Sequence, residues 1–188
     1  MVKSAIITAA GSGRRFGEPK QFKKLHGKPL YQYSLDIFIQ SRLFDEIILV
    51  IPKSNQQKVQ KEIKMKYGSQ VGLVIGGPER QDSVKNAIQN SNPKVDLVVI
   101  HDAARPFITK TLIEQCVSAC ETSDGAIIAM QPHDTIKLSN DNVVEKTIDR
   151  SIVWMAQTPQ AFNKHKILEA YSSIEFDNII VTDESSLM

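Results

Sequence analysis

Two cysteines, a net charge of only +2 and the lack of any long apolar run limit what this 188-residue chain can do. The longest unbroken apolar run, Ile47 to Ile51, is too short to cross a bilayer, and the first residues predict a strand rather than a signal peptide. A charge near neutrality excludes the global basic field that drives sequence-independent nucleic-acid binding. We therefore expect a soluble cytoplasmic protein with no membrane or nucleic-acid partner.

The two cysteines fit a reducing compartment. Cys116 and Cys120 stand four residues apart beside Leu112 and Ile113, so both lie on the apolar face of one predicted helix. We interpret them as buried thiols rather than as a metal pair or a disulfide. The chain is 41% apolar and 23% charged, as in globular proteins, and its length predicts one domain over residues 1–188.

Short β-rich runs alternate with helical patterns along the chain. The runs are 5–8, 47–51, 73–75, 96–100 and 126–130. This alternation predicts an α/β, Rossmann-like fold, with a mostly parallel sheet and helices on both faces. Residues 131–153 interrupt it, because β-rich segments there flank a polar turn at 139–142. We expect an inserted β-hairpin arm that packs on a second subunit or folds back on its own domain.

A glycine loop with cations follows the first predicted strand, from residue 9 to residue 20. Phe16 stands where a dinucleotide fingerprint needs its third glycine, and the chain lacks the Gly-Lys-Ser or Gly-Lys-Thr of a P-loop. Bare glycine backbone can still approach an anion closely. Arg15 and Lys20, fixed beside it, favour binding of a triphosphate, whereas we interpret the lysines that follow as solvated.

Two further motifs follow predicted strands. Residues 76–83 place two glycines before Ser83, which could cap a helix, and this segment would share a sheet edge with the first loop. Asp102 comes directly after the buried run 96–100, so its desolvation requires a cation or a metal, and it is a candidate Mg²⁺ ligand. Arg105 could pair with Asp102 or bind an anionic substrate, and both roles stay open.

Polar residues also stand at both ends of the predicted hairpin. Residues 134–137, 149–150 and 157–160 read as ordinary strand ends and a turn. A hydroxyl and a guanidinium that converge there would equally suit a phosphate monoester.

Seven motifs in order resemble the 2-C-methyl-D-erythritol 4-phosphate cytidylyltransferase family. They are residues 9–21, 76–84, 101–106, 134–137, 149–150, 158–160 and 182–184. The resemblance implies an enzyme of isoprenoid precursor synthesis that joins CTP to the methylerythritol phosphate, releases pyrophosphate and uses Mg²⁺. It also implies a homodimer built through the β-arm.

The resemblance further implies a role for each matched residue. Those implied to be catalytic are Arg15, Lys20 and Arg150. Those implied to bind the nucleotide are Ala10, Gly11, Gly13, Gly77 and Ser83. Those implied to bind the polyol phosphate are Asp102, Arg105, Thr135 and Thr158. Asp102 is also the implied metal ligand, and the arm would carry Thr135 and Arg150 into the partner's site.

The implied nucleophile needs no general base. A phosphate monoester has a second pKa of about 6 and is mostly dianionic at neutral pH. The lack of a Ser-His-Asp or Cys-His signature agrees, because two anions need positioning and charge neutralisation more than proton abstraction. We therefore interpret His101 as a structural hydrogen-bonding residue.

The chain stops where residues 182–185 predict the start of a helix, with Thr182 as the capping hydroxyl. Family members continue to a strand with an Asn-Ile-Lys-Val-Thr segment, so we expect this chain to be truncated and poorly active. Two other functions stay open. A ribitol-5-phosphate cytidylyltransferase would differ in the polyol phosphate, although Ala104 and the Asp149–Arg150 pair favour methylerythritol phosphate. A noncatalytic nucleotide-binding scaffold or sensor would keep the loop without turnover.

Overall fold

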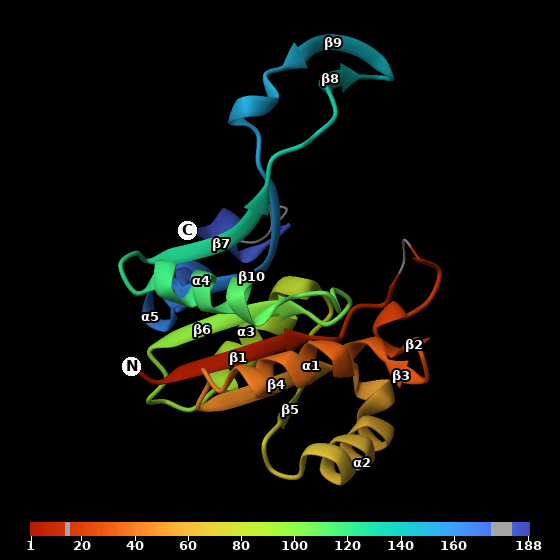
Figure 1. Ribbon diagram of the computed structural model, residues 1–188, viewed down its shortest axis with the longest axis vertical. Helices are drawn as coiled ribbons and strands as arrows, with labels where there is room; N and C mark the ends of the chain where they lie inside the picture. Colours follow the sequence, from red (N-terminus) through yellow and green to blue (C-terminus); the bar gives the residue numbers. More distant parts are fainter. Residues whose placement is uncertain (14–15, 174–181) are drawn as a thin grey trace.

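The computed structural model describes residues 1–13, 16–173 and 182–188. Six of its strands form a central sheet in the order β5-β4-β1-β6-β10-β7 (Figure 1). These strands are β1 (Lys3–Thr8), β4 (Glu46–Ile51), β5 (Gly72–Ile75), β6 (Leu97–Asp102), β7 (Gly125–Met130) and β10 (Met155–Asn163). Strands β5, β4, β1 and β6 are parallel, and β10 runs antiparallel to both β6 and β7. The predicted α/β architecture is confirmed.

Strand β10 is the main correction to the predicted sheet. Residues 157–160 were expected to form a turn, but they lie inside β10, where the pairing with β7 shifts register between Ala156 and Gln160. Pro159 explains the error, because proline cannot donate to a ladder and argues against a central strand. The irregular pairing accommodates this proline, so the strand continues past it.

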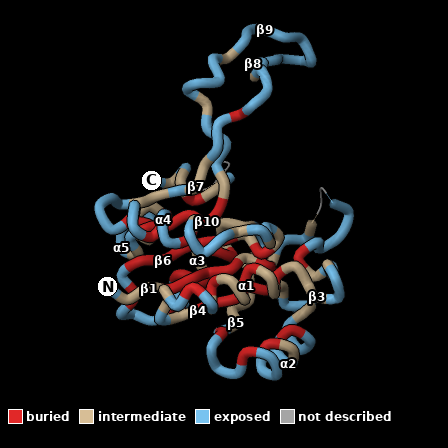
Figure 2. Tube along the Cα trace, in the orientation of Figure 1, coloured by how far each residue is buried: buried red, intermediate tan, exposed pale blue. Residues whose placement is uncertain are grey.

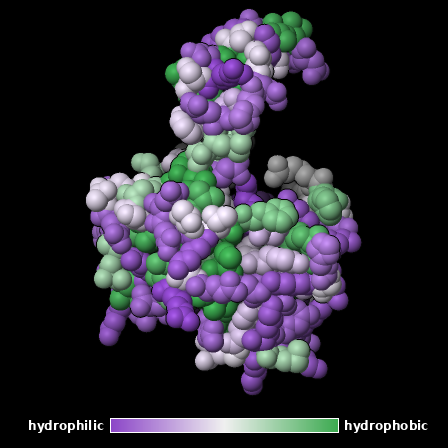
Figure 3. Space-filling model, in the orientation of Figure 1, coloured by the Kyte–Doolittle hydropathy of each residue, from purple (hydrophilic) through white to green (hydrophobic). Residues whose placement is uncertain are grey.

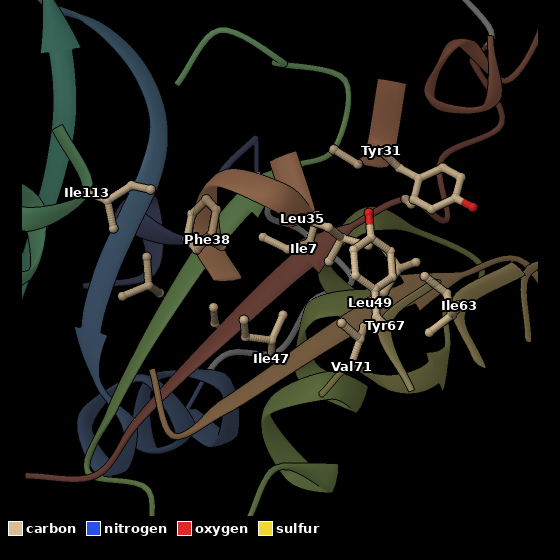
Figure 4. Close-up of a cluster of buried hydrophobic side chains, with 14 of the residues drawn as sticks. Ile7, Tyr31, Leu35, Phe38, Ile47, Leu49, Ile63, Tyr67, Val71 and Ile113 are labelled. Carbon is tan, nitrogen blue, oxygen red and sulfur yellow. The ribbon is translucent and has the colours of Figure 1, made fainter. Parts of the chain in front are cut away.

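Helices cover both faces of the sheet. One face carries α1 (Leu30–Ser41), α2 (Gln56–Tyr67) and α4 (Lys110–Cys120); the other carries α3 (Arg80–Asn90) and α5 (Lys164–Ser173). Alternation along β1 supplies both cores, because Ile7 packs under the first group of helices and Ile6 under the second. Figure 4 shows the first core, where side chains of α1 and α2 meet those of β1 and β4. Both predicted thiols, Cys116 and Cys120, are buried there without a disulfide.

Short elements connect these layers. They are η2 (Lys20–Phe22), β2 (Lys24–Leu25), β3 (Lys28–Pro29), η3 (Lys53–Asn55), η4 (Arg150–Ile152) and η6 (Glu184–Leu187). The caps differ from those predicted: Glu79 rather than Ser83 caps α3, in a capping box with Asp82. Asp183 rather than Thr182 caps η6, since its carboxylate accepts from the Ser186 N–H.

The predicted hairpin arm is present and stands away from the sheet. Strands β8 (Ile136–Asn140) and β9 (Val143–Ile148) pair antiparallel through a two-residue turn, Asp141 and Asn142, both at positive φ. Figures 1 and 2 show the hairpin projecting from the body with almost all of its residues exposed. It does not fold back on its own domain, which removes one of the two expected arrangements.

The order of the parallel strands places a ligand site. The chain leaves β1 toward β4 and β5 on one side, then crosses the sheet to β6 on the other side of β1. In such sheets ligands bind outside the carboxyl ends of the strands where the direction of winding reverses. That point lies at the ends of β1 and β6, next to the glycine loop and Asp102. Among the described residues, no helix is both long and apolar enough to span a membrane.

Candidate active site

The Gln21 side chain holds the glycine loop against the end of β1. Its Nε2 donates to the carbonyl oxygens of Ala9, at 2.8 Å, and Gly11, at 2.7 Å, and Gln21 itself is only 5% exposed. Gly13 then turns the chain at a φ of +70°, where a Cβ would overlap the Glu18 carbonyl group. The described part of the loop is therefore held by its own backbone and by one glutamine that the sequence motifs gave no role.

The second glycine segment touches the first, as predicted. A Cβ on Gly76 would overlap the Ala10 Cβ and would lie 2.6 Å from the Ser83 hydroxyl oxygen. Ser83 Oγ accepts from the Gly77 N–H at 3.1 Å and lies 3.1 Å from the Glu79 carbonyl oxygen, to which it can donate. The two segments thus meet at one edge of the sheet, with Ala10, Gly77 and Ser83 brought together.

A cavity of about 180 Å³ opens beside this edge. Its lining comes from α3, β6 and the loop after it, β10 and the C-terminal segment: Arg80, Asp102, Arg105, Ala156, Gln157, Thr158, Gln160, Thr182 and Asp183. Asp102, Arg105 and Thr158, three of the predicted substrate residues, are therefore brought to one cavity. The other residues that line the cavity were not predicted to bind substrate.

Asp102 is surrounded by cationic and hydroxyl donors. Its Oδ1 accepts from Arg80 Nη2 at 3.3 Å and from Thr8 Oγ1 at 3.2 Å, and its Oδ2 accepts from Arg105 Nε at 3.2 Å. Burial alone would raise the pKa of Asp102, but Arg80 and Arg105 outweigh it and hold that pKa below its usual range. The Asp102 carboxylate thus has the cationic partners that its burial requires. Arg105 pairs with Asp102 and also lines the cavity, so its second expected role, binding an anionic substrate, stays a prediction.

The described residues build no metal site around Asp102. No group of three His, Cys, Asp or Glu side chains within them could hold a metal ion. Two guanidinium groups already contact the Asp102 oxygens and would repel a dication. These side chains therefore do not fit a resident Mg²⁺ held by the protein.

Arg80 joins the cavity to the C-terminal segment. Its Nη1 lies 2.7 Å from both carboxylate oxygens of Glu184, which is completely buried and also accepts from the Tyr171 hydroxyl at 3.3 Å. Burial raises the pKa of Glu184, and the Arg80 guanidinium opposes that rise. Both residues lie in motifs noted above, at 76–84 and 182–184, but no local pattern indicated that they pair.

His101 is structural, as interpreted from the sequence. Burial lowers its pKa to about 4, so the ring is neutral at neutral pH. Its Nε2 lies 3.1 Å from the Arg105 carbonyl oxygen, which can only accept, so Nε2 carries the proton and Nδ1 accepts from Thr158 Oγ1 at 3.1 Å. The Thr158 hydroxyl also accepts from the Asp102 N–H at 3.1 Å. Its proton is thus already donated within the protein.

The remaining predicted residues lie elsewhere. Thr135 and Arg150 are exposed at the base of the arm and do not line the cavity, and Arg150 donates to the His133 carbonyl oxygen. Lys20 is exposed at the start of η2. Arg15 lies outside the described residues.

Comparison with known proteins decides the family. A sequence model described as 2-C-methyl-D-erythritol 4-phosphate cytidylyltransferase matches residues 3–188. A protein of that name from Syntrophus aciditrophicus is 40% identical, over 98% of this chain and 81% of its own length. Another from Aquifex aeolicus is 42% identical, over 98% and 82%. The chain belongs to the 2-C-methyl-D-erythritol 4-phosphate cytidylyltransferase family. It is therefore a nucleotidyltransferase.

Solved structures of this family share the fold. A 4-diphosphocytidyl-2C-methyl-D-erythritol synthase from Anaerococcus prevotii superposes with a TM-score of 0.87 at 34% identity, over 99% of this chain and 80% of that one. The cytidylyltransferase of Francisella tularensis gives 0.82 at 31% identity, over 100% and 85%. The predicted family and its mostly parallel α/β sheet are confirmed.

Proposed function

We propose that this chain transfers the cytidylyl group of CTP to 2-C-methyl-D-erythritol 4-phosphate in isoprenoid precursor synthesis. A phosphate oxygen of the polyol phosphate attacks the α-phosphorus of CTP and forms a new P–O bond. The bond from that phosphorus to the oxygen bridging to the β-phosphate breaks, and pyrophosphate leaves with its electron pair. The family match over residues 3–188 is the observation that carries this proposal.

The surroundings of the cavity agree with a reaction that needs no general base. His101, which lies next to Asp102, is fully buried and neutral, and both ring nitrogens are occupied by protein partners. The attacking phosphate is mostly dianionic at neutral pH, because its second pKa is about 6. The residues here would act by positioning two anions and neutralising their charge.

The glycine loop is the proposed nucleotide site. It follows β1 at the point where the sheet reverses its winding; Gly11 presents bare backbone, and Gly13 supplies the turn against Glu18. Ala10 of this loop, with Gly77 and Ser83 of the touching second segment, completes the proposed cytidine site. Arg15 and Lys20 are proposed to stabilise negative charge that develops on the triphosphate.

The cavity is the proposed site for the polyol. Arg80 and Arg105 contribute two positive charges and Asp102 and Asp183 two negative ones, so the formal charge of its described lining is zero. Such a lining suits the hydroxyl groups of a polyol better than a phosphate dianion. A further cation is needed for the phosphate, and we assign that role to Arg150.

Arg150 can serve this purpose from a second copy of the chain. We propose one nucleotidyltransferase domain in which residues 131–153 form an arm that crosses to a partner and brings Thr135 and Arg150 to its cavity. The arm exposes Val143 and Ile152, which are 68% and 76% accessible, and Trp154 directly after it is 61% accessible. Figure 3 shows apolar surface on the arm and beside its base. An isolated hairpin of this kind is marginal in water, so burial against a partner would stabilise it.

The proposed function also includes the binding of Mg²⁺ and a location in the cytoplasm. Since the protein side chains do not fit a resident metal, we propose that Mg²⁺ binds with CTP, where it would neutralise triphosphate charge, while Asp102 stays paired with Arg80 and Arg105. A cytoplasmic location is supported by the two unpaired thiols, Cys116 and Cys120.

The test is pyrophosphate release from CTP, Mg²⁺ and the methylerythritol phosphate, with ribitol 5-phosphate in a parallel reaction. We expect release with the first polyol phosphate and a much smaller kcat/KM with the second. A preference for ribitol 5-phosphate would assign the other cytidylyltransferase activity. Binding of CTP without release from either substrate would refute the proposal and favour a noncatalytic nucleotide-binding protein.

A further inference from the structure

The inner wall of the cavity is held by two adjacent carboxylates of the C-terminal segment. Glu184 accepts from Arg80 through both oxygens, and Asp183 Oδ2 accepts from Gln160 Nε2 at 2.7 Å. We propose that Glu184 and Asp183 are positioning residues for the polyol, acting through Arg80 and Gln160. This inference rests on the proposed function, because it assigns these residues to the polyol site of that reaction.

Glu184 does not itself line the cavity, so its effect on a ligand must pass through Arg80. Its carboxylate is completely buried, where an unpaired charge is strongly unfavourable, so it holds the guanidinium in one place. The other end of the same guanidinium lies 3.3 Å from Asp102 Oδ1. Arg80 is one-third exposed, so without Glu184 it could turn toward water and leave Asp102 with a different orientation.

Asp183 fixes the orientation of the Gln160 amide in a similar way. Nε2 points toward two acceptors, the Asp183 carboxylate and the Gln157 carbonyl oxygen at 3.3 Å, so Oε1 must point the other way. Gln160 lines the cavity, and its Oε1 is buried without a hydrogen-bond partner among the described residues. A buried acceptor without a partner costs free energy. Oε1 is not exposed to the cavity, so a hydroxyl group of a bound polyol can donate to it only after the Gln160 amide turns toward the cavity.

The alternative is that Glu184 only stabilises the fold by attaching η6 to α3. The two roles differ in what they change. A purely structural role lowers stability and leaves the KM of the folded enzyme for both substrates unchanged. A positioning role raises KM for the polyol phosphate and leaves KM for CTP unchanged, because the glycine loop is held separately by Gln21.

The decisive variant is Glu184→Gln, which keeps the shape and removes the charge. We expect KM for the methylerythritol phosphate to rise about tenfold, with KM for CTP within twofold of the unmodified chain. Asp36→Asn is the matched control, since Asp36 also accepts from a cation and a tyrosine, Lys28 and Tyr67, but belongs to α1 and contacts α2 rather than the cavity. It should lower the thermal midpoint and change neither KM.

A double-mutant cycle tests whether Glu184 acts through Arg80. Arg80→Gln should raise KM for the polyol phosphate, and adding Glu184→Gln should raise it no further. Additive effects would overturn the inference, as would unchanged KM in Glu184→Gln or an equal change for both substrates.

Gln160→Met supplies an independent result. It removes the unpaired acceptor and also the donor to Asp183 and to the Gln157 carbonyl oxygen. KM for the polyol phosphate should therefore rise, and the thermal midpoint should fall because two hydrogen bonds are lost. A wild-type KM would overturn the assignment of Gln160, and with it that of Asp183.

Direct binding separates this inference from the proposed function. Calorimetric titration of methylerythritol phosphate onto the chain with a nonhydrolysable CTP analogue measures affinity without turnover. If the unmodified chain binds but releases no pyrophosphate, the proposed reaction fails, and weaker binding by Glu184→Gln still supports the positioning role. If the unmodified chain releases pyrophosphate, and Glu184→Gln and Gln160→Met bind methylerythritol phosphate as tightly as it does, only the positioning role is refuted. No binding to the unmodified chain refutes both.

Discussion

Replacing Gln21 by leucine should loosen the glycine loop and weaken CTP binding. The side chain is almost fully buried, and its amide gives one hydrogen bond each to the carbonyl groups of Ala9 and Gly11. Leucine has a similar volume but no donor, so the pocket stays filled while both bonds disappear. The loop is the proposed binding site of the triphosphate, so a more mobile loop should bind CTP less tightly and raise the KM for CTP.

The loss of stability depends on whether water can reach each carbonyl group once Gln21 no longer donates to it. The Ala9 carbonyl is buried, and an unpaired buried acceptor costs about 1–3 kcal/mol, whereas Gly11 is exposed and water can replace its partner. Leucine recovers part of this by burying apolar atoms. We expect a net loss of about 2 kcal/mol, which for a chain of this length lowers the thermal midpoint by about 4–8 °C.

Thermal unfolding followed by circular dichroism and steady-state pyrophosphate release test the two effects together. Gln60→Leu is the matched control, because Gln60 is an exposed residue of α2, and neither its midpoint nor its KM should change. If Gln21→Leu has the midpoint and the KM for CTP of the unmodified chain, Gln21 does not position the loop.

Three further changes have defined outcomes. Lys20→Ala should lower kcat about 100- to 1,000-fold without unfolding the chain. Mixing Lys20→Ala subunits with Arg150→Ala subunits should restore about a quarter of the activity if the arm completes the partner's site in a twofold dimer. No recovery would refute a site shared between subunits. Gly76→Ala should raise KM for CTP and cost about 1–3 kcal/mol, measured by urea unfolding, because its Cβ would overlap Ala10. Burial lowers the pKa of His101 to about 4 from an ordinary 6.5, so the unfolded chain takes up this proton first. The free energy of unfolding should therefore fall as the pH decreases from about 6.5 to about 4, and His101→Gln should flatten that fall in urea titrations at each pH.

Much of the fold was readable from local patterns. The parallel strands were predicted because buried parallel strands form short apolar runs such as 47–51. The hairpin was predicted because two β-rich runs flank a polar turn, and the structure places Asp141 and Asn142 of that turn at positive φ. Strand β10 was missed because Pro159 is the strongest local signal against a strand, and only pairing with strands far along the chain overrides it.

The candidate site was readable where function leaves a local motif. Glycines beside cations and a carboxylate after a buried strand indicated the glycine loop and Asp102, because each pattern reflects the chemistry of a single segment. Local patterns could not decide whether Arg105 pairs with Asp102, since that depends on the bend of the chain after β6. The arm residues Thr135 and Arg150 show the same limit, because one chain alone does not carry them into its own cavity.

The positioning residues are hidden from sequence reasoning for a physical reason. Gln21 acts on carbonyl groups, which every residue possesses, so its two acceptors leave no mark on the side chains of the loop. Arg80 and Glu184 are 104 residues apart and meet only because α3 and η6 pack on the same face of the sheet. A buried glutamate with no local partner is nevertheless costly enough that a cation must reach it. A glutamate between capping and apolar residues is therefore a position at which to look for a distant arginine. Here that arginine also contacts Asp102, a residue of the proposed substrate site.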